Sequence, residues 1–173
     1  MDLPGTVDLG SGLSLVRATL SDAAAIYRIG SQEGVTRHLP LETMTCEDDG
    51  ERFLGRLLEA ARIRGGAVWA ITDAGGCIGI VDLLDWRPET CGFTLAYLLD
   101  PASWGKGIAS RVVAGLLATL PDAGVRMLLA PVFRENAASA RVLVKNGFAL
   151  SRTETLEIGA LFQEVDFFER TIG

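Results

Sequence analysis

The chain has few of the residues that covalent and metal-centred catalysis require. Its 173 residues include three cysteines and one histidine. Cys46, Cys77 and Cys91 are scattered without a C-x-x-C spacing, so we expect neither a disulfide framework nor a zinc site. Because His38 is the single histidine, any Ser-His-Asp or Cys-His constellation would have to include it. Nucleophilic catalysis and a bound metal are therefore not expected.

An excess of basic charge and long apolar runs are also missing. The 16 lysines and arginines are outnumbered by 22 acidic residues, and the formal charge of -6 argues against a nucleic-acid partner. The acidic balance suits a cationic acceptor such as an amine, and it equally suits solubility. No run approaches the roughly 20 apolar residues of a membrane span, and the N-terminus resembles no signal peptide. We therefore expect a cytoplasmic protein without a membrane partner.

The apolar content of 49% is ample for one sizeable core. Residues 1–12 are rich in glycine and aspartate and show no periodicity, so they are expected to form a loose N-terminal lead-in. Residues 13–173 are expected to form a single domain.

Hydrophobic periodicity and turn residues predict an α/β fold, in the sense of a mixed sheet flanked by helices. Helices are predicted after Ser21 and after Thr45, the latter with Asp48 at the capping-box position. Short connectors make residues 67–99 an antiparallel meander, whereas the strands at 92–99 and 126–132 are joined through a helix and should be parallel. The predicted strands cover residues 13–17, 67–72, 77–84, 92–99, 126–132, 148–157 and 163–170, and further helices begin near residues 104 and 136.

A glycine-rich turn links the strand at 92–99 to the next helix. It reads Trp104-Gly105-Lys106-Gly107-Ile108-Ala109. Such a turn would present unpaired backbone N–H groups at a helix N-terminus, where the helix dipole favours an anion. The chain has no G-x-x-x-x-G-K-[ST] motif and the turn follows a meander, so neither a P-loop nor a dinucleotide fold is expected. An ordinary connection without a ligand remains the alternative.

Two separated segments resemble the GCN5-related N-acetyltransferases. The turn WGKGIA resembles that superfamily's Q/R-x-x-G-x-G/A pyrophosphate loop, and residues 136–148 (NAASARVLVKNGF) resemble its N-x-x-S…K-x-G-F segment. Residues 97–107 (YLLDPASWGKG) resemble the Y-x-L-x-P-x-x-W-G-x-G run of the ribosomal-protein-alanine acetyltransferase branch, with Leu98 where Trp is frequent. Arg17, Asp22 and residues 35–40 also match, so the likeness covers nearly the whole chain.

The resemblance implies a mostly antiparallel central sheet of about six to seven strands with about four helices, and a parallel, splayed strand pair at the acetyl-CoA site. It implies acetyl-CoA as co-substrate, no metal, direct transfer to an amine, and a monomer or homodimer. Backbone amides from Trp104 to Ala109 would hold the pyrophosphate, while main-chain groups of Leu98 and Leu99 pair with the pantetheine arm. Asn136 and Ser139 would lie near the thiol, although both also fit a plain helix start.

The chemistry needs an oxyanion donor, a proton for the leaving sulfur and a neutral amine. Leu98 or Leu99 would supply a backbone N–H to the oxyanion, and Ser139 would protonate the thiolate. Thr94 stands where family members that use a base often place Glu. The remaining base candidates, each of which also fits a surface or structural role, are Glu33, Asp82, Asp85, Glu135 and His38.

Amine basicity helps to choose the acceptor. A lysine amine costs about 4.6 kcal/mol to deprotonate at pH 7, whereas a peptide α-amine costs only about 1 to 1.4 kcal/mol. A site without an evident strong base therefore favours a protein or peptide N-terminal amine. The alternatives are a small-molecule amine, such as a polyamine, an antibiotic or an amino-acid derivative, and a non-catalytic acyl-CoA-binding module.

Overall fold

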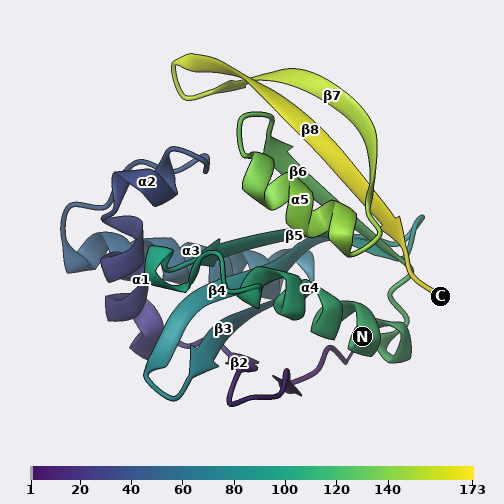
Figure 1. Ribbon diagram of the computed structural model, residues 1–173, viewed down its shortest axis with the longest axis horizontal. Helices are drawn as coiled ribbons and strands as arrows, with labels where there is room; N and C mark the ends of the chain where they lie inside the picture. Colours follow the sequence, from purple (N-terminus) through teal and green to yellow (C-terminus); the bar gives the residue numbers. More distant parts are fainter. Residues whose placement is uncertain (1) are drawn as a thin grey trace.

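One eight-stranded sheet runs through the computed structural model, which describes residues 2–173 (Figure 1). The strands lie in the order β1-β2-β3-β4-β5-β6-β8-β7. They are β1 (Thr6–Asp8), β2 (Ser14–Arg17), β3 (Ala67–Asp73), β4 (Gly76–Arg87), β5 (Gly92–Leu99), β6 (Met127–Phe133), β7 (Ala149–Ile158) and β8 (Leu161–Thr171). The helices are α1 (Ala23–Gly30), α2 (Glu33–Thr36), α3 (Glu47–Arg64), α4 (Ile108–Thr119) and α5 (Ala137–Lys145), with short 3-10 turns η1 (Leu20–Asp22), η2 (Pro101–Ser103) and η3 (Leu120–Ala123).

All neighbouring strands are antiparallel except β5 and β6, which are parallel. Their pairing covers only Gly92 with Met127, Phe93 with Leu128 and Thr94 with Leu129. Beyond Thr94 the two strands separate, so the second half of β5 has a neighbour on one side only. The predicted mixed, mostly antiparallel sheet with a splayed parallel pair is confirmed.

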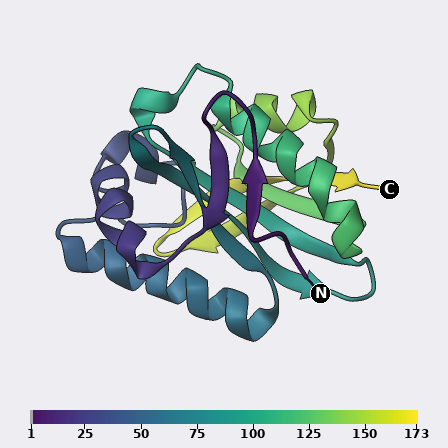
Figure 2. The same cartoon turned by 90° about the horizontal axis from the view of Figure 1, so that it is seen from below.

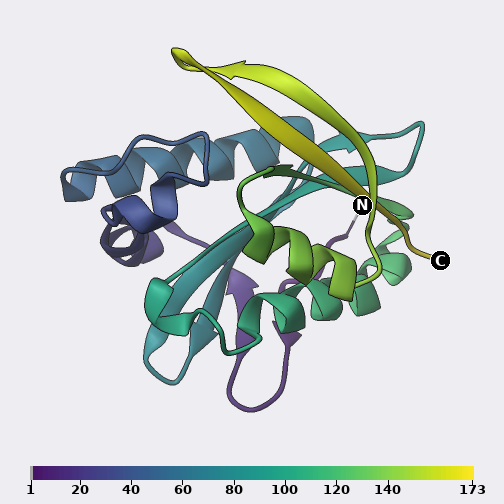
Figure 3. The same cartoon turned by 45° about the horizontal axis from the view of Figure 1, so that its top comes forward.

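The helices cover both faces of the sheet (Figures 2 and 3). On one face, α1 and α3 pack on β3 and β4 through a core that includes Ile26, Leu54 and Ile80. On the other face, α4 packs on a larger core that includes Leu95 and Leu116. Because alternate strand residues point to opposite faces, both cores are built from the same three central strands.

The predicted loose lead-in at residues 1–12 is wrong where the structure describes it. Residues Thr6–Asp8 form β1, which pairs antiparallel with β2, and Val7 is buried. Leu9 then packs over Gly115 of α4. A strand of three residues is too short for periodicity to reveal it, which is the reason for the error. Met1, part of the same predicted segment, lies outside the described residues.

Several element ends also differ from the prediction. The helix predicted after Thr45 is α3, and its N-cap is Cys46 rather than Thr45. The capping box uses Asp49 rather than Asp48. Helix α4 begins at Ile108, after the separate turn η2, rather than near Trp104. The sheet has eight strands rather than six or seven, because β1 is added. Within residues 2–173, no helix is both long and apolar enough to cross a membrane.

Candidate active site

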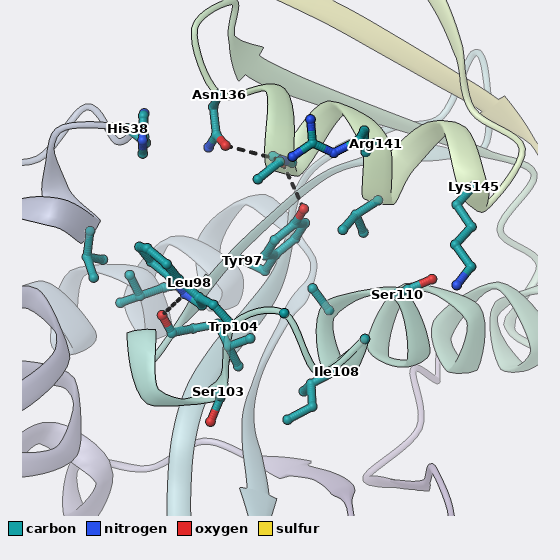
Figure 4. Close-up of a pocket in the computed structure, with 18 of the residues that line it drawn as sticks. His38, Tyr97, Leu98, Ser103, Trp104, Ile108, Ser110, Asn136, Arg141 and Lys145 are labelled. Atoms are coloured by element: carbon teal, nitrogen blue, oxygen red, sulfur yellow. Dashed lines mark hydrogen bonds between the residues drawn. The ribbon is translucent and has the colours of Figure 1, made fainter.

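A cavity of about 400 Å³ opens beside the second half of β5 (Figure 4). Its walls come from the end of β5, the turn into α4, one side of α5 and the segment that follows α2. Nine of the predicted site residues line it, namely Leu98, Leu99, Trp104, Gly105, Gly107, Ile108, Ala109, Asn136 and Ser139. Lys106, the tenth, is exposed and does not line the cavity. The fold therefore brings the glycine turn at residues 104–109 and the segment that begins at Asn136 to the same cavity.

The turn into α4 leaves several backbone donors unused by the helix. Gly107 is the N-cap with a φ of 74° and no side-chain cap, and the first helical bond runs from Arg111 N to Gly107 O. The N–H groups of the first three helical residues, from Ile108 onward, consequently have no acceptor within α4. A Cβ at Gly105 or Gly107 would meet no protein atom within 4 Å. The open space over these glycines suits a bound anion rather than a packed side chain.

Two basic side chains that the sequence analysis missed also line the cavity. Arg141 and Lys145 lie one helical turn apart on α5, and Lys145 points toward Ser110 at the start of α4 (Figure 4). Asn146 bridges the two helices, because its Nδ2 donates to Ser110 Oγ at 3.1 Å. The spacing of four between two basic residues after Asn136 was the available signal. Their charges complement a polyanionic ligand held at the α4 N-terminus.

The end of β5 turns its main-chain groups alternately toward β4 and toward the gap. Asp100 N donates to Ile78 O on the β4 side, and Cys91 O accepts from Arg126 N on the β6 side. Alternation along the strand directs the N–H of Leu99 into the gap and that of Leu98 toward β4. The geometry thus favours Leu99 as the main-chain donor. The predicted main-chain role of Leu98 does not fit, although its side chain lines the cavity.

Trp104 forms part of the cavity wall. Its side chain is half-exposed, and its indole Nε1 donates to Leu99 O at 2.8 Å. This bond fixes the end of β5 against the turn that precedes α4. The Leu99 carbonyl is therefore engaged, which leaves its N–H as the group directed into the gap.

Tyr97, Ser139 and Asn136, all of which line the cavity, are connected by hydrogen bonds. Figure 4 shows Tyr97 and Asn136 with these bonds as dashed lines. The Tyr97 and Ser139 hydroxyl oxygens are 2.8 Å apart, and Ser139 N donates to Asn136 Oδ1 at 3.1 Å. Burial raises the pKa of the Tyr97 phenol, so the phenol keeps its proton at neutral pH. Asn136 thus caps α5 and thereby orients Ser139. Tyr97 was not among the predicted site residues, although the Y-x-L-x-P run contains it.

The base candidates separate by environment. His38 lines the cavity, but its Nε2 accepts from Arg37 Nε at 3.1 Å, and its Nδ1 lies 3.7 Å from Glu135 Oε1. In the neutral ring the proton is therefore on Nδ1, and the lone pair of Nε2 is already engaged. Glu135 and Glu33 are exposed.

The two aspartates on β4 differ sharply from each other. Asp85 is partly exposed and forms an ion pair with Arg64 at 2.9 Å. Asp82 is 7% exposed, and burial, with a smaller contribution from the charge of Asp85, raises its pKa to about 7. Thr94, where the resemblance leads one to look for Glu, accepts a hydrogen bond from Arg87 Nη1 at 3.0 Å. Among residues 2–173, no group of three or more His, Cys, Asp or Glu is placed to hold a metal.

The sequence profile of a family described as the acetyltransferase (GNAT) domain matches residues 13–149. This match covers most of the chain, and the chain belongs to that family. A curated relative, the uncharacterized N-acetyltransferase YoaA of Bacillus subtilis (strain 168), is 29% identical over 139 residues, which cover 79% of this chain and 78% of YoaA. The predicted family and the predicted enzyme class, an N-acetyltransferase that uses acetyl-CoA, are confirmed.

Solved structures share the fold at low sequence identity. RimL, a ribosomal L7/L12 alpha-N-protein acetyltransferase in complex with coenzyme A, superposes with a TM-score of 0.86 at 17% identity, over 96% of this chain and 98% of RimL. Spermidine N-acetyltransferase from Vibrio cholerae, in complex with CoA and spermine, superposes with a TM-score of 0.77 at 18% identity, over 94% and 96% of the two chains. These neighbours differ in acceptor, so the shared fold leaves the acceptor open.

Proposed function

We propose that this N-acetyltransferase transfers acetyl from acetyl-CoA directly to the amino terminus of a protein or peptide. The observation that carries the proposal is the single cavity that joins the uncapped start of α4, the Leu99 N–H and the hydrogen-bonded hydroxyls of Tyr97 and Ser139. These groups are of the kinds that bind a pyrophosphate, stabilise an oxyanion and protonate a leaving thiolate.

The residues divide the reaction among them. Backbone N–H groups of the glycine turn and the start of α4, from Gly105 to Ala109, bind the pyrophosphate, with Arg141 and Lys145 adding positive charge. The N–H of Trp104, also predicted for this role, is already bonded to Pro101 O. Acetyl-CoA supplies the thioester that is broken. The Leu99 N–H donates to the carbonyl oxygen as negative charge develops there, which is worth about 3 kcal/mol in comparable sites. Ser139 donates its hydroxyl proton to the sulfur as the C–S bond breaks, and Tyr97 holds that hydroxyl in place.

An α-amine is the acceptor that this site handles most easily. At pH 7 the deprotonation of an α-amine costs about 1 to 1.4 kcal/mol, against about 4.6 kcal/mol for a lysine side chain. The cavity contains no unpaired carboxylate among its lining residues, and its histidine is hydrogen-bonded to Arg37. RimL, with the same fold, acts on a protein α-amine. Each of these points supports the α-amine over a lysine side chain.

A polyamine is the second candidate. The net charge of -6 attracts polycations, and the spermidine N-acetyltransferase with spermine bound has the same fold. No cluster of acidic side chains lines the cavity itself, which favours the peptide amine over the polyamine.

An acceptor panel tests the proposal. Thiol release from acetyl-CoA is measured with a tripeptide that has a free amino terminus, the same tripeptide with a blocked terminus and an internal lysine, and spermine. We expect turnover with the free terminus only, with mass spectrometry placing the acetyl group on the α-nitrogen. Turnover with spermine and not with the peptide would overturn the choice of acceptor.

A further inference from the structure

Asp82 is a buried carboxylate for which the roles assigned above have no use. It lies in the middle of β4 and is 7% exposed. Within residues 2–173, no side-chain hydrogen bond or ion pair involves it, in contrast to Asp85, which pairs with Arg64. A buried carboxylate without a partner is costly, because burial disfavours its charged form. Such a group is a candidate for chemistry rather than for stability.

The strand register places Asp82 one strand away from the gap. Asp82 lies opposite Val68 of β3 on one side and opposite Ala96 of β5 on the other. Its side chain is on the α1–α3 face of the sheet, because it shares parity with Ile80, which belongs to that core. Adjacent strands lie about 4.8 Å apart, a distance that one water spans with two hydrogen bonds of about 2.8 Å.

The surface between Asp82 and the gap is open. Ala96 is small and exposed, whereas its same-face neighbour Leu98 is buried. Ala96 therefore leaves room above β5 for a water or an amine, on the same strand as Leu99 and three residues before it. The pyrophosphate site lies at the start of α4. The acceptor would reach Ala96 from the other face of the sheet, on which α1 and α3 lie.

Few charges act on this position. The inward faces of α1 and α3 present apolar residues such as Ile26, Leu54 and Ala61. The one charged neighbour that acts on the Asp82 carboxyl is Asp85. Thr94, also on this face, accepts from Arg87. Asp100 directly follows Leu99, but its carboxylate pairs with Arg28 and accepts from Ala102 N. Because threonine cannot accept a proton at neutral pH, Asp82 is the carboxylate beside β5 that is left without a partner.

We propose that Asp82 accepts the proton of the acceptor ammonium, through one water held over Ala96. This inference rests on the proposed function and names the proton acceptor that the function needs. The ammonium loses one proton through the water to the Asp82 carboxylate and becomes a neutral amine. The amine nitrogen then attacks the thioester carbonyl, the C–N bond forms and the C–S bond breaks. The second nitrogen proton passes to the Ser139 oxygen, which has given its own proton to sulfur, and Asp82 returns its proton to solvent.

The test compares Asp82→Asn with Asp82→Glu on a tripeptide with a free amino terminus, over pH 6 to 9. The native enzyme should show an acidic limb in kcat/KM. Asp82→Asn should lower the plateau of kcat/KM about 100-fold. The only pH dependence left should be that from ionisation of the acceptor amine itself. Asp82→Glu should keep part of the activity, because a carboxylate remains. The affinity for CoA should be the same in all three proteins, which separates lost proton transfer from misfolding.

A peptide whose amino terminus is replaced by a hydrazide group, so that it has no α-amine, supplies a second readout, because the terminal nitrogen of the hydrazide is already neutral at pH 7. Loss of a proton acceptor should slow the peptide amine and spare the hydrazide, whereas a structural defect should slow both equally. Asp85→Asn is the matched control, since it removes a charge three residues away. Asp85→Asn should keep the plateau of kcat/KM. It should move the acidic limb to lower pH, because the charge of Asp85 raises the pKa of Asp82.

The outcomes separate the two proposals. If the native chain acetylates the peptide and Asp82→Asn keeps the same plateau and limb, Asp82 has no such role and the proposed function stands. If Asp82→Asn slows the hydrazide as much as the peptide, the role of Asp82 is structural. If the native chain turns over neither the peptide nor the hydrazide, the proposed function falls and this inference with it.

Discussion

The hydroxyl oxygens of Tyr97 and Ser139 lie 2.8 Å apart and connect β5 to α5 across the gap between β5 and β6. Tyr97 comes from the strand that supplies the Leu99 N–H, and Ser139 from the helix that carries Arg141 and Lys145. The bond therefore ties the oxyanion side of the site to the coenzyme side. It also holds a serine hydroxyl in one orientation, which proton transfer to a leaving sulfur requires.

Replacing Ser139 with Ala tests its assigned role. The variant keeps the backbone N–H that Asn136 caps, so α5 should stay intact. We expect kcat to fall about 100-fold, because the leaving thiolate loses its proton donor, while the CoA affinity measured by calorimetry stays unchanged. Tyr97→Phe should have a smaller effect, and the double variant should be no slower than Ser139→Ala alone. Unchanged turnover in Ser139→Ala would leave that residue with only a helix-start role.

The glycine turn makes a prediction about binding. Gly107→Val should weaken CoA binding at least 100-fold, because a valine disfavours the φ of 74° and its side chain fills the space over the α4 N-terminus. Gly124→Val is the matched control. Gly124 has a φ of 80° and equal open space, but it lies at the far end of α4. The control should lose similar stability and bind CoA normally, and equal loss of affinity in both variants would contradict the pyrophosphate assignment.

Local signals predicted much of this fold and site. The strand at Gly92–Leu99 has its predicted bounds, and the glycine turn and Asn136 lie at the starts of α4 and α5 as their capping chemistry indicates. These features depend on residues adjacent in sequence. They could therefore be recognised without knowing the sheet.

The features that could not be predicted from the sequence depend on strand register. The choice between Leu98 and Leu99 depends on which neighbouring strand each N–H faces, and a shift of one residue reverses it. The proximity of Asp82 to the reacting end of β5 follows only from its pairing with Ala96. The lead-in was missed because β1 has only three residues, and because Leu9, which follows it, packs on Gly115, over a hundred positions away in the sequence.

Gly115 provides a test of how β1 is anchored. Alanine at an interior helix position usually stabilises by about 1 kcal/mol relative to glycine. At Gly115 the added Cβ would collide with Leu9, so we expect urea denaturation to show no gain. Gly55→Ala in α3 is the control, because its Cβ would lie 3.9 Å from Leu20, an ordinary contact, and it should gain the full amount. In a Leu9→Ala background, Gly115→Ala should stabilise, and a gain in the native background would contradict the packing of Leu9 on α4.

The buried carboxyl of Asp82 should make stability depend on pH. Because folding raises its pKa from 3.8 to about 7, the protonated acid is favoured in the folded state. The stability that it contributes is complete below the unfolded pKa of 3.8 and is lost as the pH rises through about 7. Asn at this position stays neutral, so the loss disappears. The advantage of Asp82→Asn in unfolding free energy should grow from about 2 kcal/mol at pH 5 to about 4 kcal/mol at pH 8.

Urea denaturation of both proteins between pH 5 and pH 8 measures this difference, with Asp122→Asn as the control, because Asp122 is exposed in η3. The control should run parallel to the native protein at every pH. If the curve of Asp82→Asn also runs parallel, the Asp82 carboxyl is ionised in the folded state at neutral pH without cost. A stability advantage of Asp82→Asn that rises with pH, together with slower acetylation by this variant, would mean that the Asp82 carboxylate lowers stability but is retained because it accepts the proton of the acceptor amine.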